Sequence, residues 1–298
     1  MLTGVHFLLT YRCNYECDHC FLYCGPGAAG TFTIAQIDQV LTEAERIGTV
    51  EWIYFEGGEP FLYHPVLLEG LRRSRQRGFR TGVVTNGYWA TGAEDIELWI
   101  APLKEAGIAS LSVSDDDFHN EPGQGPASRV MPVASRLGIR SAPICIEQPT
   151  SARDMNKGAP VEGGGVLFKG RAADKLTGGL PTRPADTFTE CPHEELVAPE
   201  RVHVDPLGHV HVCQGVSMGN MWQRPLSELV AEYDPSSHPI CGPLVRGGPA
   251  ELARTHDVRL DGDFVEECHH CFAVRRTLVE RFPEQLAPRQ VYGLEDAP

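Results

Sequence analysis

Apolar runs of strand length alternate with amphipathic patterns of helical period through the first half of the chain. The run GVHFLLTY begins at Gly4 and is followed by TIAQIDQVLTEAERIG, a helical pattern for which Thr31 or Thr33 is the expected cap. Further predicted strands are EWIYFEG, RTGVVTN, IASLSVS and IRSAPICIE, and the helices between them are VLLEGLRRSRQRG, ATGAEDIELWIAPLKEAG and PASRVMPVASRLG. This alternation predicts an α/β fold with a parallel sheet of βα units.

The pattern changes in the second half of the chain. GVLFKGRA, residues 165–172, has the apolar character of a sixth strand, and Gly, Pro and Thr crowd residues 176–184, which we interpret as a linker. Beyond the linker, RVHVDPLGHVHVC predicts a β-hairpin with its turn at residues 206–208. We therefore expect a main domain at 1–175 and a small module with a C-terminal helix at 185–298.

Composition limits the class of protein. The 298 residues, 42% of them hydrophobic, suffice for one large domain and an appendage. No apolar run approaches the roughly 20 residues of a membrane span, and no signal peptide precedes the first strand, so we expect a cytoplasmic protein without membrane contact. In that reducing compartment, ten cysteines indicate metal ligands and reactive thiols rather than disulfides.

The charge is strongly acidic, with 40 acidic against 26 basic residues and a formal net charge of -14. This charge opposes nucleic-acid binding and favours cationic ligands. Ordinary solubility explains the same excess without any substrate.

Cys13, Cys17 and Cys20 form a CxxxCxxC motif directly after the first predicted strand. Three thiolates at this spacing can hold a [4Fe-4S] cluster and leave one iron open, and such an iron can chelate S-adenosylmethionine (SAM) and reduce it to a 5'-deoxyadenosyl radical. A zinc site is the alternative, with His19 or Cys24 as its fourth ligand.

GGEP at residues 57–60 ends the second predicted strand. Together with the three-cysteine motif, it resembles the radical SAM superfamily. The resemblance implies a partial (βα)6 barrel with the cofactor site at the carboxyl ends of the strands. It also implies that the glycines admit the SAM amino group, because a side chain there would collide.

The same resemblance suggests further SAM contacts at strand ends, in the cysteine loop and in the GRA turn. Its candidate cofactor-binding residues are His19, Gly57, Gly58, Glu59, Pro60, Thr85, Asn86, Ser114 and Arg171. His19 takes the place of an aromatic residue near adenine, and Arg171 is the candidate partner of the SAM carboxylate.

Four more cysteines lie in the C-terminal module, namely Cys191, Cys213, Cys268 and Cys271. Four thiolates can saturate a second [4Fe-4S] cluster, and the hairpin followed by GNMWQRPLSEL resembles the auxiliary SPASM or twitch module. Structural zinc on the same thiolates is the alternative.

Acidic residues follow the predicted fourth and fifth strands. Asp115, Asp116 and Asp117 stand in SVSDDDFHNE, and Glu147 ends the next strand. At the barrel mouth, such carboxylates would hold a polyammonium sugar, with His119 orienting one of them. For one or two of the aspartates, a solvated loop or a helix cap is the competing interpretation.

Three cysteines remain. Cys145 lies in the apolar run APICI, where we expect a small buried side chain; Cys24 is expected in a loop over the first cluster. Cys241 stands in SSHPICGPLVRGGP, between prolines and glycines, in a segment that we expect to be irregular.

The whole set of motifs resembles the radical SAM epimerases of aminoglycoside biosynthesis, in which a loop cysteine returns a hydrogen atom to the substrate radical. Cys241 is the position matched to that donor. The resemblance implies a cationic amino-sugar substrate and a reducing partner such as flavodoxin or ferredoxin. Alternatives are a radical SAM dehydrogenase that uses the auxiliary cluster as electron acceptor, and a non-catalytic metal-binding module.

Overall fold

The computed structural model describes residues 1–121, 123–149 and 165–294, and its strands form one eight-stranded sheet in the order β5-β4-β3-β2-β1-β6-β7-β8. Neighbouring strands from β5 to β6 pair in parallel, and β7 and β8 are antiparallel. The strands are β1 (Gly4–Thr10), β2 (Trp52–Gly57), β3 (Arg80–Thr85), β4 (Ser110–Ser114), β5 (Ser141–Ile144), β6 (Arg201–Val204), β7 (His209–Cys213) and β8 (Val216–Asn220).

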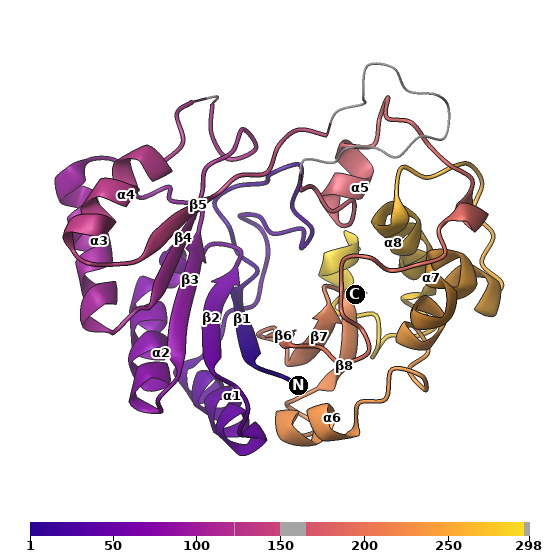
Figure 1. Cartoon of the computed structure of the whole chain (residues 1–298), viewed down its shortest axis with the longest axis horizontal. Coiled ribbons are helices and arrows are strands. Elements are labelled where there is room, and N and C mark those ends of the chain that lie inside the picture. Colours follow the sequence, from indigo (N-terminus) through magenta and orange to yellow (C-terminus); the bar gives the residue numbers. More distant parts are fainter. Residues whose placement is uncertain (122, 150–164, 295–298) are drawn as a thin grey trace.

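The helices divide into two groups, as Figure 1 shows. Four of them, α1–α4, lie beside β1–β5, while α5, α7 and α8 gather on the far side of β6–β8. The remaining helix, α6, contacts both α1 and β8. None of the described helices is both long and apolar enough to cross a lipid bilayer. The helices are α1 (Ile34–Ile47), α2 (His64–Gln76), α3 (Ala93–Glu105), α4 (Ala127–Arg136), α5 (Arg171–Lys175), α6 (Leu226–Glu232), α7 (Cys241–Thr255) and α8 (Glu267–Leu278).

Helix α1 shows how local sequence defines an element. The Thr33 hydroxyl accepts a hydrogen bond from the Gln36 backbone N–H, and the Gln36 side chain accepts one from the Thr33 N–H, which completes a capping box. Gly48 ends the helix in the left-handed conformation, with φ of 76°. The predicted cap at Thr33 is confirmed.

Alternation along the strands separates the two faces of the sheet. Val5, Phe7 and Leu9 of β1 belong to the apolar core under α1–α4. The residues between them, His6 and Leu8, face the opposite side and line cavities there. We call this side, to which His6 and Leu8 point, the inner face of the sheet, and it is the face available to ligands.

The five strands and four helices predicted for the first half are confirmed, with shifts of a few residues at their ends. The predicted strand at 165–172 is wrong, because residues 165–170 form turns and bends and Arg171 begins α5. The sixth parallel strand is β6, which pairs with β1 across the sheet.

The predicted hairpin is confirmed as β6 and β7, and it extends the main sheet. A second apolar core, containing Leu244, Leu252, Phe272 and Tyr292, joins α7 and α8 behind this extension. The predicted boundary between two domains at residues 176–184 stays a prediction. Strand β6, which follows this segment in sequence, pairs with β1 in the same sheet.

Candidate functional site

The three-cysteine loop lies at the carboxyl end of β1 and borders a cavity of ≈ 380 Å³. We call it the strand-end cavity, and Cys13, Cys17, Cys20 and Cys24 all line it. Burial raises the pKa of Cys13 to about 11 and of Cys17 to about 12. A hydrogen bond from the Cys24 thiol lowers the pKa of Cys20 to about 6. The loop therefore gathers the three predicted ligands, with Cys24 as hydrogen-bond donor to one of them.

The glycines of GGEP are required by close backbone contact within the protein itself. Gly57 has φ of 123°, and a Cβ at Gly58 would lie 2.1 Å from the Arg12 carbonyl oxygen. The Gly58 N–H donates to the Thr10 carbonyl at 2.6 Å, and the Glu59 N–H donates to the Arg12 carbonyl at 2.9 Å. The expected collision is thus with the chain's own cysteine loop, and both glycines also line the strand-end cavity.

Glu59 and Pro60 are buried and do not line that cavity. The Glu59 carboxylate accepts hydrogen bonds from the Thr85 hydroxyl at 2.8 Å and the Asn86 N–H at 2.7 Å. Burial raises the pKa of Glu59 to about 7. Glu59 therefore braces the end of β3, and the SAM contacts expected of Glu59 and Pro60 stay a prediction.

The polar residues at the ends of β3 and β4 lie at the predicted ligand site. Thr85, Asn86 and Ser114 all line the strand-end cavity, and the Asn86 amide lies 3.7 Å from the Cys13 sulfur. Arg171 lines it too, but its guanidinium Nε donates to the Cys17 carbonyl oxygen at 3.0 Å. Arg171 also donates to the Cys24 carbonyl, so it holds the cysteine loop in place.

His19 packs against two rings in the same cavity. Its ring centroid lies 4.6 Å from that of Phe118 and 5.0 Å from that of His119. Burial lowers the pKa of His19 to about 4, so the ring is neutral near pH 7, and its Nδ1 has no hydrogen-bond partner among the described residues. A neutral ring with a free polar atom suits contact with an aromatic base.

Only one of the four predicted acidic residues reaches the cavity. Asp116 is buried, lines the cavity and lies 2.7 Å from His119 Nδ1. Asp115 accepts a hydrogen bond from the Ala127 N–H at the start of α4, which makes it a cap. Asp117 and Glu147 are exposed and are not among the cavity-lining residues.

The four C-terminal cysteines meet around one small cavity, the auxiliary thiol site. Cys191 comes from a loop, Cys213 ends β7, and Cys268 and Cys271 lie in the first turns of α8. The tertiary structure thus assembles the predicted set from three segments. The site residues fit a thiolate-bound metal centre by their donor type and number.

Two buried cations that the sequence analysis missed stand beside this site. Lys169 Nζ lies 3.5 Å from the Cys213 sulfur and 2.7 Å from the Gln214 side-chain oxygen. Arg275 Nη1 lies 4.0 Å from the same sulfur, and its Nε is buried without a partner among the described residues. A thiolate-bound cluster carries net negative charge, so these cations support the fit. Spacing along the sequence could not reveal Lys169, which lies far from the cysteines, whereas Arg275 lies one helical turn beyond Cys271 in α8.

Cys241 does not lie in the expected irregular loop. It is the first residue of α7, is fully buried, and belongs to the same apolar core as Cys271. It lines neither the strand-end cavity nor the auxiliary thiol site. Burial raises the pKa of its thiol to about 12. Cys145, expected to be buried, is exposed.

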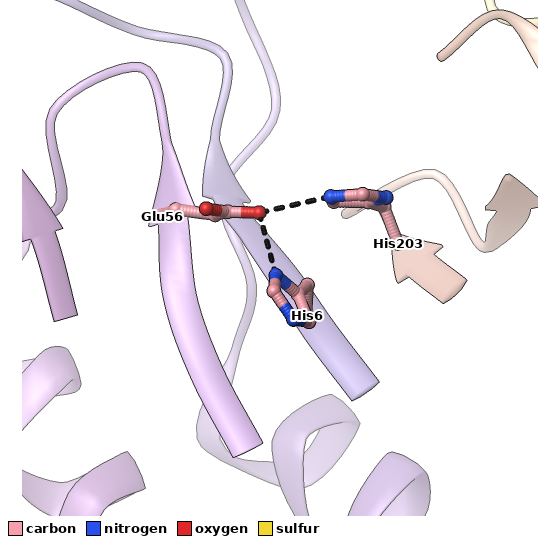
Figure 2. Close-up of side chains that lie close together, drawn as sticks. All are labelled: His6, Glu56 and His203. Atoms are coloured by element: carbon pink, nitrogen blue, oxygen red, sulfur yellow. Dashed lines mark hydrogen bonds and ion pairs between the residues drawn. The ribbon is translucent and has the colours of Figure 1, made fainter. Parts of the chain in front are cut away.

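A trio on the inner face of the sheet was also missed. Figure 2 shows the Glu56 carboxylate of β2 directed toward both His6 of β1 and His203 of β6. Glu56 Oε1 lies 2.9 Å from His6 Nδ1 and 3.0 Å from His203 Nε2. The signal in the sequence was a single polar residue at an inward position in each of three apolar runs.

Residues 7–138 match the model of the radical SAM superfamily. It is 26% identical over 111 residues to the putative peptide biosynthesis protein YydG of Bacillus subtilis, covering 37% of this chain and 35% of that protein. It is 35% identical over 109 residues to the tungsten-containing aldehyde ferredoxin oxidoreductase cofactor-modifying protein of Pyrococcus furiosus, covering 36% of this chain and 29% of that protein. The chain thus spans about a third of the length of these relatives.

Among solved structures, BtrN in complex with AdoMet and 2-DOIA is similar, with a TM-score of 0.51 at 16% identity. The similarity covers 78% of this chain and 83% of that one. At this identity, the likeness shows the fold alone.

Proposed function

We propose, taking residues 7–138 as a radical SAM domain, that the chain removes a hydrogen atom from a carbon of a cationic amino sugar or cyclitol. When bound, a [4Fe-4S] cluster on Cys13, Cys17 and Cys20 supplies, together with SAM, the 5'-deoxyadenosyl radical that such chemistry needs. The chain's own residues around that centre are the His19 ring, the strand-end polar groups and the two glycines. A one-electron reductant such as flavodoxin or ferredoxin is the proposed partner.

Charge supports a cationic substrate. Asp116 and Glu56 both line the strand-end cavity, and the chain carries a formal net charge of -14. Although burial by itself would raise it, hydrogen bonds from His203 and His6 hold the pKa of Glu56 well below its usual range. The cavity therefore presents lasting negative charge to a ligand.

Dehydrogenation is the fate of the substrate radical that the geometry supports best. In this reaction a carbon bearing a hydroxyl loses one hydrogen atom, one proton and one electron and becomes a carbonyl. The observation that carries the proposal is that Gln214 lines the strand-end cavity while the preceding residue, Cys213, lines the auxiliary thiol site. A [4Fe-4S] cluster on those four thiolates is the proposed electron acceptor.

Epimerisation, the reaction expected from the sequence resemblance, is the second candidate. It leaves the oxidation state of the substrate unchanged, because a thiol hydrogen replaces the hydrogen that the carbon lost. The resulting thiyl radical then takes up one proton and one electron, and the proposed auxiliary cluster would supply that electron. The high pKa of Cys241 keeps its thiol protonated, and Cys241 shares an apolar core with Cys271 of the auxiliary thiol site. This route requires the buried Cys241 to reach the substrate, which the dehydrogenation route does not.

One incubation separates the two reactions. The reduced enzyme is supplied with SAM and aminoglycosides or aminocyclitols in heavy water. Dehydrogenation gives a carbonyl product without solvent deuterium and is unchanged in Cys241→Ala. Epimerisation gives one deuteron at an inverted carbon, and that product disappears in Cys241→Ala. If no cationic substrate stimulates release of 5'-deoxyadenosine, the substrate class is wrong.

A further inference from the structure

The trio of His6, Glu56 and His203 is held on three adjacent strands of the sheet. Its members come from β1, β2 and β6, which are adjacent in the sheet, and His6 pairs directly with His203 in the ladder. The His6 ring also stacks on Tyr54 at 4.7 Å between ring centroids. Because strand backbones and a stacked ring limit movement, the three side chains are preorganised.

The trio brings one carboxylate and two imidazole rings together. The ion-pair partners of Glu56 in the described chain are the two imidazoles alone. A neutral imidazole offers a lone pair once its proton sits on the other ring nitrogen. The site can therefore present two nitrogen ligands and one carboxylate to a cation.

The spacing of the ligand atoms distinguishes between kinds of cation. All three atoms lie within 4.8 Å of one another, and the two contacts to Glu56 are 2.9 and 3.0 Å. Tetrahedral ligands with metal bonds of about 2.0–2.1 Å are about 3.3 Å apart. Three acceptors around an ammonium group, each at about 2.9 Å, would be about 4.7 Å apart. The two contacts to Glu56 are close to the ligand spacing around a small metal ion and too short for acceptors that surround one ammonium group.

The site also has access and room. Glu56 and His203 line the strand-end cavity, whereas His6 lines a second cavity of ≈ 730 Å³ near the amino ends of β1 and β2. The trio thus stands where two cavities approach each other. An ion held there keeps an open position for an outside ligand, as expected for two histidines and one glutamate.

We infer that His6, Glu56 and His203 form a binding site for a divalent first-row transition ion, with Zn²⁺ as the probe. The ligand atoms are His6 Nδ1, His203 Nε2 and a Glu56 carboxylate oxygen. Its ligand atoms are distinct from the cysteines of both thiol sites, although Glu56 and His203 border the strand-end cavity. The proposal does not depend on which reaction the domain performs.

The test is Zn²⁺ binding to anaerobically reconstituted protein whose thiols are occupied by iron. Equilibrium dialysis against a competing chelator should give one Zn²⁺ per chain in addition to iron. X-ray absorption at the zinc edge should show nitrogen and oxygen ligands at about 2.0–2.1 Å and no sulfur at about 2.3 Å. Zinc held by sulfur, or no additional zinc, overturns the proposal.

Matched variants locate the ion. Glu56→Gln and His203→Gln keep the size of their side chains, and each should weaken Zn²⁺ binding by at least about 100-fold. His64→Gln removes a part-buried imidazole that contacts the Trp99 carbonyl, and it should bind Zn²⁺ like the wild type. Iron content and thermal unfolding show that each variant is folded. If both trio variants bind Zn²⁺ with wild-type affinity, the site is ruled out. If a variant does not fold, the X-ray absorption spectrum of zinc in the wild-type protein still tests the proposal.

Discussion

Replacing Gly58 with alanine tests whether the GGEP glycines serve the protein's own backbone or the SAM ligand. A Cβ at this position would lie 2.1 Å from the Arg12 oxygen and 2.6 Å from the Arg12 carbonyl carbon. Relief to an ordinary carbon–oxygen contact requires a shift of about 1 Å. The obstacle is backbone, so no side-chain rotation can relieve it.

The shift would break two hydrogen bonds that join β2 to the cysteine loop. These are the bonds from Gly58 N–H to Thr10, at 2.6 Å, and from Glu59 N–H to Arg12, at 2.9 Å. Their loss costs about 1–3 kcal/mol. Together with the displacement of the cysteine loop, we expect the free energy of unfolding to fall by about 3–5 kcal/mol in total, which is large for a single substitution.

The assay is thermal and denaturant unfolding of the protein without SAM. Gly58→Ala should lower Tm by about 10 °C. Gly27→Ala, in the loop between β1 and α1, is the control, because a Cβ there meets nothing within 4 Å. If Gly58→Ala unfolds like Gly27→Ala without SAM and loses only SAM binding, the backbone argument is refuted and the collision is with the cofactor.

The other predictions concern metal content, redox tuning and pH. Alanine at Cys13, Cys17 or Cys20 should abolish SAM cleavage. The reconstituted wild-type protein should hold about eight irons, and this number should fall to about four when all four C-terminal cysteines are replaced, namely Cys191, Cys213, Cys268 and Cys271. Unchanged iron content in that variant excludes the auxiliary cluster. Lys169→Met should lower the potential of the auxiliary centre by on the order of 100 mV in EPR-monitored titration, since its ammonium lies 3.5 Å from the Cys213 sulfur; an unchanged potential would show that the cation has no tuning role. Although burial alone would raise it, hydrogen bonds from His209 and His211 hold the pKa of Asp205 well below its usual range. Its stabilising contribution is therefore present above about pH 4 and lost as the pH falls further, so Asp205→Asn should show a shallower loss of stability in acid than wild type. Salt should weaken binding of the cationic substrate, and salt-independent binding would argue against the charge-based assignment.

The local elements and the ligand types could be predicted from the sequence. Alternation in GVHFLLTY and the Thr33–Gln36 capping box are properties of neighbouring residues, so they are visible without a fold. Cys13, Cys17 and Cys20 likewise lie within one short loop, and the structure keeps them together. Short-range geometry depends little on the rest of the chain.

What required the tertiary structure was every relation between distant segments. The sixth parallel strand is β6 rather than residues 165–170, because pairing with β1 joins residues almost two hundred positions apart. The same pairing places His203 beside His6 and Glu56, while packing of α7 against α8 buries Cys241. Side-chain direction at a strand end also depends on neighbours, so Asp116 enters the cavity whereas Asp115 caps α4. Sequence periodicity reports which face of an element is apolar, but only the packing of elements decides what each polar side chain meets.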